Sequence, residues 1–155
     1  MYKEIEDFME LARQNDMLCP EYDREIKSAK SRIELFKTIL KVQPMEVVCQ
    51  SISHGWGDAV SAFEKLFPDF INGKVEKDGK YSSAIYIKHK GKIEGNATLI
   101  TIIDSDVEID VDDYVYIQIF AAGRTKIKAK GKHISVDVYG DGVELDGYYE
   151  KISFV

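Results

Sequence analysis

Two stretches of the chain carry residues whose types and spacing suggest chemistry. In "SDVEIDVDD", which begins at Ser105, acidic residues alternate with apolar ones, and in "TKIKAKGK", which begins at Thr125, lysines do the same. Clustered carboxylates can bind calcium, and a strip of lysines can bind phosphate or a glycan acid. A calcium loop, however, brings its oxygens to one point, whereas these acids are spread along roughly 20 Å of extended strand. We therefore interpret both stretches as structural and expect no metal ion and no cofactor.

When the sequence is aligned with itself so that Asp106 lies opposite Lys126, each alternate acid of the first stretch lies opposite a lysine of the second. The pairs are Asp106 with Lys126, Glu108 with Lys128, Asp110 with Lys130, and Asp112 with Lys132. Parallel strands stacked in register would place these charges side by side, and each exposed pair would contribute about 0.2 to 1 kcal/mol. This predicts a structural charge ladder that specifies register more than it supplies stability.

A second, apolar column repeats with nearly the same period. A slightly shorter shift stacks Val115 on Ile134, Ile117 on Val136, and Ile119 on Val138. Two columns with nearly one period are typical of a β-solenoid, in which successive coils stack on each other. We therefore expect a short β-solenoid with coils of about 20 residues, and the alternative is an antiparallel β-sandwich or roll.

The elements that position these strands fall into two halves. Residues 1–72 show apolar residues at helical spacing, with prolines and glycines at the expected boundaries, and predict a domain of three or four helices. Residues 73–155 alternate with period two between turn signals and predict a β-repeat domain of about eight short strands. The expected fold class is α+β, with the helical half as a cap on one end of the β half. We expect the junction to include Asn72, Ser82, Ser83 and Trp56.

Four aromatic residues are candidates for interaction with a partner: His54, Trp56, Tyr114 and Tyr116. His54 and Trp56 lie in "SHGWG", and tryptophan is common at binding hot spots. The two tyrosines lie among the acids of the β half, a combination that suits sugar binding. A structural interpretation stands beside each of these, because Trp56 can pack a helix junction and tyrosines favour half-buried strand positions.

The sequence contains no convincing catalytic constellation. Cys49 and His54 are too far apart along the chain to share one helix face, and no third residue is placed to orient them. The sequence matches none of the common nucleophile, zinc, phosphate-loop or dinucleotide motifs. Whether the chain is an enzyme is left open, and the residues argue against it.

Charge and cysteine usage narrow the partners and the location. A net charge of -6 argues against binding to nucleic acid or to anionic membranes, which both require basic surfaces. Cys19 and Cys49 lack metal-ligand spacing, and the charged N-terminal residues do not form a signal peptide. We expect a cytoplasmic protein.

Several short motifs give the chain a resemblance. They are "CPEY" at Cys19, "HGWG" at His54, "FINGK" at Phe70 and "GKYSSAIY" at Gly79, followed by a run of short alternating strands. In this order, which spans most of the chain, they resemble a group of small uncharacterised proteins encoded in prophages and mobile elements of gut bacteria. The resemblance implies a phage-type or mobile-element protein and brings no catalytic residues with it.

Two functions remain as expectations. The first is a non-catalytic interaction or assembly protein whose partner is another protein: a host factor, a virion component or a second copy of the chain. Oligomerisation is therefore open. The second is a glycan-binding or cell-wall-binding module, with hydrolytic activity as a further option.

Overall fold

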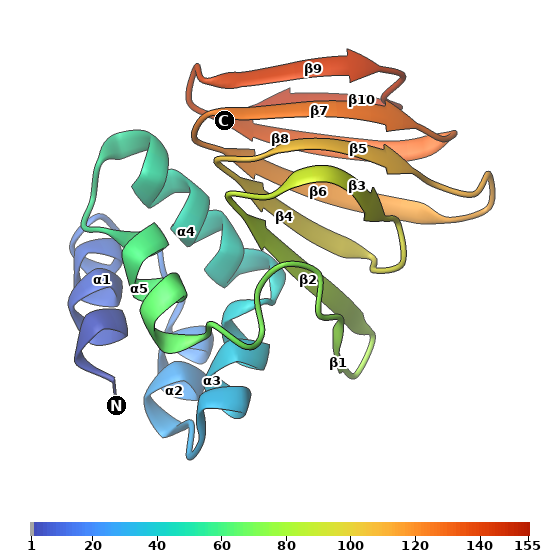
Figure 1. Cartoon of the computed structure of the whole chain (residues 1–155). Coiled ribbons are helices and arrows are strands. Elements are labelled where there is room, and N and C mark those ends of the chain that lie inside the picture. The colour runs from blue at the N-terminus through green and yellow to red at the C-terminus, as the bar shows by residue number, and fades with distance from the viewer. Residues whose placement is uncertain (1) are drawn as a thin grey trace.

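The computed structural model describes residues 2–155, with the exception of the side chain of Asp78. Within these residues the chain forms five helices followed by ten strands (Figure 1). The helices are α1 (Lys3–Gln14), α2 (Pro20–Ser28), α3 (Arg32–Ile39), α4 (Val42–His54) and α5 (Ala59–Leu66). The strands are β1 (Glu76–Asp78), β2 (Tyr81–Ile87), β3 (Lys90–Glu94), β4 (Leu99–Ile103), β5 (Asp106–Asp110), β6 (Tyr116–Ala122), β7 (Thr125–Lys130), β8 (His133–Tyr139), β9 (Val143–Gly147) and β10 (Lys151–Phe154). The predicted α+β fold, a helical cap with a β-solenoid, is confirmed. The described residues form five helices where three or four were expected, and ten strands where about eight were expected.

Local signals in the sequence explain where the helices begin and end. The Ser31 side chain accepts a hydrogen bond from the Glu34 N–H at 3.2 Å, and Asp58 accepts one from the Ser61 N–H at 2.9 Å. Such caps satisfy N–H groups that have no partner within the helix. Helix α4 ends at Gly55, whose φ of 70° is left-handed and favours glycine.

The strands form a solenoid of about four turns with two parallel columns. One column is a six-stranded sheet in the order β1-β2-β4-β6-β8-β10, and the other is a four-stranded sheet in the order β3-β5-β7-β9. Strand β1 pairs antiparallel with β2, and every other pair among the described strands is parallel. This pairing excludes the antiparallel sandwich or roll.

The register is the predicted one in the charged column and differs in the apolar column. Strand β5 pairs with β7 at the predicted offset, with Asp106 opposite Lys126. The predicted apolar column was wrong by two positions, because Ile134 lies opposite Ile117 and not opposite Val115. A slip of two positions keeps the same side chains facing inward, so the apolar alternation cannot distinguish the two registers.

The interior of the solenoid is filled from both sheets. Ile100, Ile119 and Val136 of the six-stranded sheet face Ile109 and Ile127 of the four-stranded sheet, and none of the five is more than 1% exposed. Burying aliphatic side chains of this size stabilises the fold by about 1.5 to 3 kcal/mol each. This column supplies the stability that the exposed charge ladder cannot.

The helices cover the outer face of the six-stranded sheet (Figure 1). Helix α4 packs on β6 and β8, and α3 lies against β1. Ile103, Phe120 and Tyr139 point outward from the sheet and share one core with helical residues such as Phe36 and Phe67. The helical cap therefore packs along the side of the stack, where the strand face and the helices bury each other, and not over one end as expected.

Two of the four residues expected at the junction make hydrogen bonds that tie the halves together. The Ser83 hydroxyl donates to the Leu40 carbonyl at 2.9 Å, and the Asn72 side-chain oxygen accepts from the Ile87 N–H at 3.3 Å. Ser82 instead bonds within the sheet to Thr98, and Trp56 lies just beyond the end of α4. In the part of the chain described, no helix has the length and apolar character that a membrane span requires.

Candidate interaction surface at the open end of the solenoid

In the last coil of the described chain only the six-stranded sheet has a strand. Strand β10 extends the six-stranded sheet beyond β8, but among the described strands none pairs with the far side of β9 (top of Figure 1). The interior of the stack is therefore not closed at this point. We refer to the surface formed by β9 and β10 here as the open end.

Apolar side chains that would be interior in a complete coil are exposed at the open end. Ile152 and Phe154 lie opposite Val136 and Val138 and continue their columns. Val136 and Val138 are buried, whereas Ile152 is 42% exposed and Phe154 is 80% exposed. On β9, Val143 and Leu145 point inward and are half-buried. These four side chains of the open end form an apolar shelf, next to a position beside β9 that no described strand occupies.

The backbone of β9 also has an unpaired edge. The Thr125 N–H donates to the Gly142 carbonyl at 3.3 Å, which shows that Gly142 faces β7. Because alternate residues of a parallel strand face opposite neighbours, Val143 and Leu145 direct their N–H and C=O groups away from β7. An edge of this kind is a template for another strand.

The turn between β9 and β10 is held in place, so the open end has a defined shape. The Tyr149 hydroxyl donates to the carbonyls of Asp146 at 2.9 Å and Ile127 at 3.1 Å. Burial of the ring raises the pKa of Tyr149 to about 12, so the hydroxyl keeps its proton at neutral pH. Gly147 has a φ of 99°, and a Cβ there would collide with the Ala129 carbonyl.

The outer face of the four-stranded sheet carries rows of alternating charge that lead to the open end. One row is Lys90, Asp106, Lys126 and Glu144, and the next row is Lys92, Glu108, Lys128 and Asp146. The last pair of the first row is in contact, since Lys126 Nζ lies 3.5 Å from Glu144 Oε2. Each row ends on an acid with no neighbouring strand beyond it among the described strands.

The sequence identified the middle of these rows and missed both ends. The offsets that pair Lys90 with Asp106, and Lys126 with Glu144, are shorter than the one that pairs Asp106 with Lys126, so a single period does not reach them. The alternation itself is visible in "KGKIE" and "VELDG". The fourth predicted pair lies beyond the strands, where Lys132 Nζ is 3.4 Å from the Asp113 carboxylate instead of bonding Asp112.

The predicted aromatic residues lie in two separate places. Tyr116 stacks on His133 with 4.1 Å between the ring centroids, and His133 lies 3.3 Å from the Glu150 carboxylate. Tyr114 is 86% exposed and borders a hollow of about 400 Å³. That hollow is lined by Asp110, Val111, Asp112, Asp113, Tyr114, Lys130 and Gly131.

The other two aromatic residues, His54 and Trp56, stack on each other at the end of α4. Their ring centroids are 4.9 Å apart, and the His54 side chain is exposed. They belong to the helical half, whereas Tyr114 and Tyr116 belong to the β half. The role of all four aromatic residues in an interaction stays a prediction.

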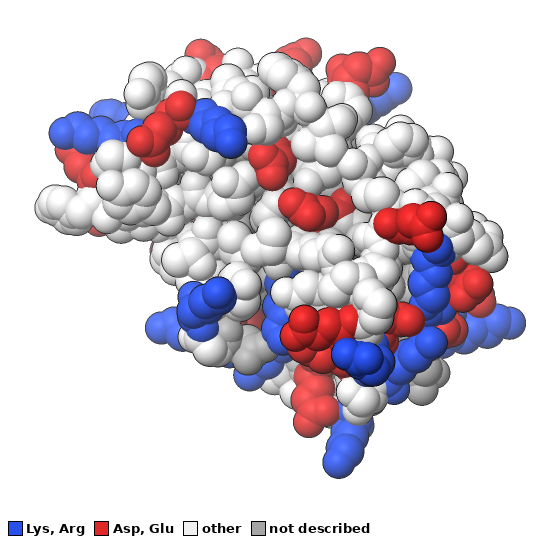
Figure 2. All heavy atoms as spheres, turned by 180° about the vertical axis from the view of Figure 1, so that it is seen from behind, with Lys and Arg blue, Asp and Glu red and all other residues white. Residues whose placement is uncertain are grey.

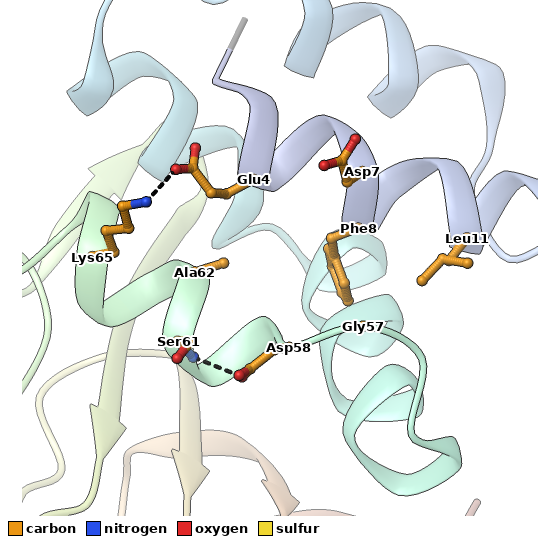
Figure 3. Close-up of a pocket in the computed structure, with 9 residues that line it drawn as sticks. All are labelled: Glu4, Asp7, Phe8, Leu11, Gly57, Asp58, Ser61, Ala62 and Lys65. Carbon is orange, nitrogen blue, oxygen red and sulfur yellow. Dashed lines mark hydrogen bonds and ion pairs between the residues drawn. The ribbon is translucent and has the colours of Figure 1, made fainter.

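A second hollow, a groove, lies between α1 and α5 (Figure 3). It has a volume of about 430 Å³, and Phe8 and Leu11 form its apolar side. Three of its charged groups already have partners: Glu4 and Lys65 pair with each other at 2.7 Å, and Asp58 caps α5. The figure shows the Glu4 and Lys65 side chains bridging the groove at one end.

The remaining candidates for chemistry are unsuited to it. Cys49 is completely buried, and desolvation, followed by the charges of Glu46 and Asp137, raises the pKa of its thiol. A buried neutral thiol is a poor nucleophile. Among the described residues, no group of three His, Cys, Asp or Glu side chains is placed to hold a metal ion.

Charge is distributed unevenly over the molecule. Seen from behind, charged side chains gather over the helical half and along the upper edge of the β half, and a broad area with few charges lies between them (Figure 2).

Comparison of the chain with protein-family models, curated proteins and solved structures finds no match. The case for a function therefore rests on the geometry of the open end and of the hollow beside Tyr114.

Proposed function

We propose that this chain is a non-catalytic interaction protein of phage or mobile-element type, and that the open end of the solenoid contacts another protein. The observation that carries the proposal is the 80% exposure of Phe154 at the end of a buried apolar column. Covering such a side chain contributes about 1.5 to 3 kcal/mol to association. The proposed partner is a host factor, a virion component or a second copy of the chain.

The phage or mobile-element origin is supported by the motif resemblance alone, from "CPEY" to "GKYSSAIY". The interaction role has independent physical support. The open end combines an apolar shelf with an unpaired strand edge, and these two features together are typical of a site for strand addition.

The test is a capture experiment with a matched control. The tagged chain is incubated with lysate of the bacterium that encodes it, beside the variants Ile152→Lys and Ile33→Lys. Ile33 is 39% exposed on α3 and Ile152 is 42% exposed on β10, so both substitutions place a lysine at an isoleucine of similar exposure. We expect Ile152→Lys to lose a protein that the wild type and Ile33→Lys retain, and the purified protein to bind stoichiometrically in calorimetry.

Two results would contradict the proposal. One is that all three chains retain the same proteins, and the other is that none of them captures any. Melting curves of both variants confirm that the substitutions leave the fold intact.

One observation favours the second candidate, glycan binding. Tyr114 exposes 86% of its surface beside a hollow with three carboxylates, and an aromatic ring next to acids can stack on a sugar and bind its hydroxyls. The test is calorimetric titration of the wild type and Tyr114→Ala with soluble cell-wall fragments. Saturable heat that disappears in the variant would support glycan binding, and a flat titration would remove it.

A further inference from the structure

The topology of the open end restricts what can dock there. A second copy of the chain could continue the four-stranded sheet by placing its β3 beside β9. Its β2, which belongs to the same coil as its β3, would then occupy the place that β10 already fills. Head-to-tail continuation of the stack by a second whole solenoid is therefore blocked, and the position beside β9, which no described strand occupies, fits one strand.

The chemistry on the two sides of that position is specific. On the inward side, an added strand would cover Ile152 and Phe154, which requires apolar residues at alternate positions. On the outward side, it would lie beside Glu144 and Asp146, the acids that end the charge rows. Both acids are exposed, and like charges opposite each other are destabilising, so the residues that fit are basic.

We propose that the open end accepts one extended strand of a partner protein in which lysine or arginine residues alternate with apolar residues. The strand adds to the free edge of β9 through main-chain hydrogen bonds, and its side chains provide specificity. This inference rests on the proposed function of the open end and names the chemistry of its partner.

The chain itself contains a strand with this pattern. Strand β7, "TKIKAK", packs against the other edge of β9. In this ladder Lys126 lies opposite Glu144 and Lys128 opposite Asp146, while Ile127 meets Leu145 in the interior. A partner strand would repeat on the free edge of β9 what β7 does on the paired edge.

This internal copy supplies the probe. A synthetic peptide with the sequence TKIKAK, blocked at both ends, is titrated into the full chain and compared with TEIEAE. Two charge pairs of ordinary strength correspond to about a tenfold difference in Kd, so we expect TKIKAK to bind about tenfold more tightly. In the double variant Glu144→Lys with Asp146→Lys, the preference should reverse.

A control separates the site from the net charge of the molecule. The double variant Asp7→Lys with Asp69→Lys makes the same change in charge at exposed acids of the helical half. It should leave the tenfold preference for TKIKAK unchanged. Ile152→Lys should abolish binding of both peptides, since it places a charge on the apolar shelf.

The outcomes are distinguishable from those of the proposed function. Equal affinity for the two peptides, or a preference that survives the charge reversal at Glu144 and Asp146, would overturn the strand chemistry. If Ile152→Lys still lost the captured protein in that case, the interaction role would stand and its partner would be of another kind. Dimers that dissociate in Ile152→Lys would identify the occupant as a second copy and also overturn the inference.

Discussion

The two sheets of the solenoid are made by the same coils but are stabilised differently. In the six-stranded sheet, every residue of β4 is buried, because the solenoid interior lies on one side and the helices lie on the other. In the four-stranded sheet, β5 of the same coil alternates exposed acids with buried apolar residues. A sheet covered on both faces is held by apolar packing, and a sheet with one wet face can use charge to specify register.

The difference predicts which sheet is sensitive to truncation. Phe120 is 1% exposed between the six-stranded sheet and the helices, and Phe120→Ala should lower the free energy of unfolding by about 3 to 5 kcal/mol. Urea denaturation measures this loss. The control is Lys128→Ala on the wet face, which should change it by less than about 0.5 kcal/mol. Equal losses in the two variants would remove the contrast between the sheets.

The end of the four-stranded sheet contains one position where backbone geometry dominates. Gly147 has a φ of 99°, and a Cβ there meets the Ala129 carbonyl, so Gly147→Ala should destabilise the fold by about 1 to 3 kcal/mol. Gly79→Ala is the matched control, since Gly79 also has a positive φ of 58° but has open space around it. Thermal melts compare the two. A larger fall in Tm for Gly79→Ala would mean that the contact at Ala129 is unimportant.

The charge rows should be measurable as coupling between strands. Lys128 lies between Glu108 and Asp146, so Lys128→Glu places three acids in a row and should lower Tm by about 2 to 4 °C. Adding Glu108→Lys should restore part of the loss and not all of it, because the new lysine lies opposite Lys92. A double-mutant cycle measures the coupling. Purely additive changes would show that the rows do not contribute to register.

The smallest effect is expected for one carboxyl group, that of Glu46 on α4, which faces the charge of Asp137 on β8. Desolvation and the charge of Asp137 raise the pKa of the Glu46 carboxyl, and desolvation also raises the pKa of Asp137. Because the folded pKa is above the unfolded value, ionisation destabilises the fold as pH rises through and above about 4.3. Glu46→Gln should therefore raise Tm by about 1 to 2 °C at pH 7 and leave it unchanged below pH 4.

A pH series of melting curves for wild type and Glu46→Gln tests this sign. Glu21→Gln, at an exposed position on α2, is the control and should show no such pH dependence. A stabilisation by Glu46→Gln that is larger at pH 4 than at pH 7 would contradict the raised pKa.

Most of the fold was predictable because it follows from local patterns. Period-two alternation predicted strands after Asn72, and the opposite charges at Asp106 and Lys126 predicted parallel stacking. The apolar column was predicted two positions out of register, since after a slip of two positions the same side chains still face inward. The side on which the helices pack could not be read from apolar spacing, which shows that a face is buried but not against which element.

The candidate site was predicted less completely. The acids and lysines of β5 and β7 were identified, but Glu144 and Asp146 were not, because the coils differ in length and the last offset is shorter than the one between β5 and β7. The exposure of Ile152 and Phe154 also contradicts their apolar character, which by itself indicates interior positions. Only the position of β10 beyond the last strand of the other sheet explains that exposure.

The sequence by itself therefore determined the two halves and the opposite charges of β5 and β7, and it favoured parallel stacking, since each depends on neighbours along the strand or on one repeated offset. The tertiary structure alone decided that the helices cover the six-stranded sheet and that β10 has no described strand opposite it. The first depends on which elements come into contact in the folded chain and the second on how many described strands each column contains, and neither is a property of a single segment.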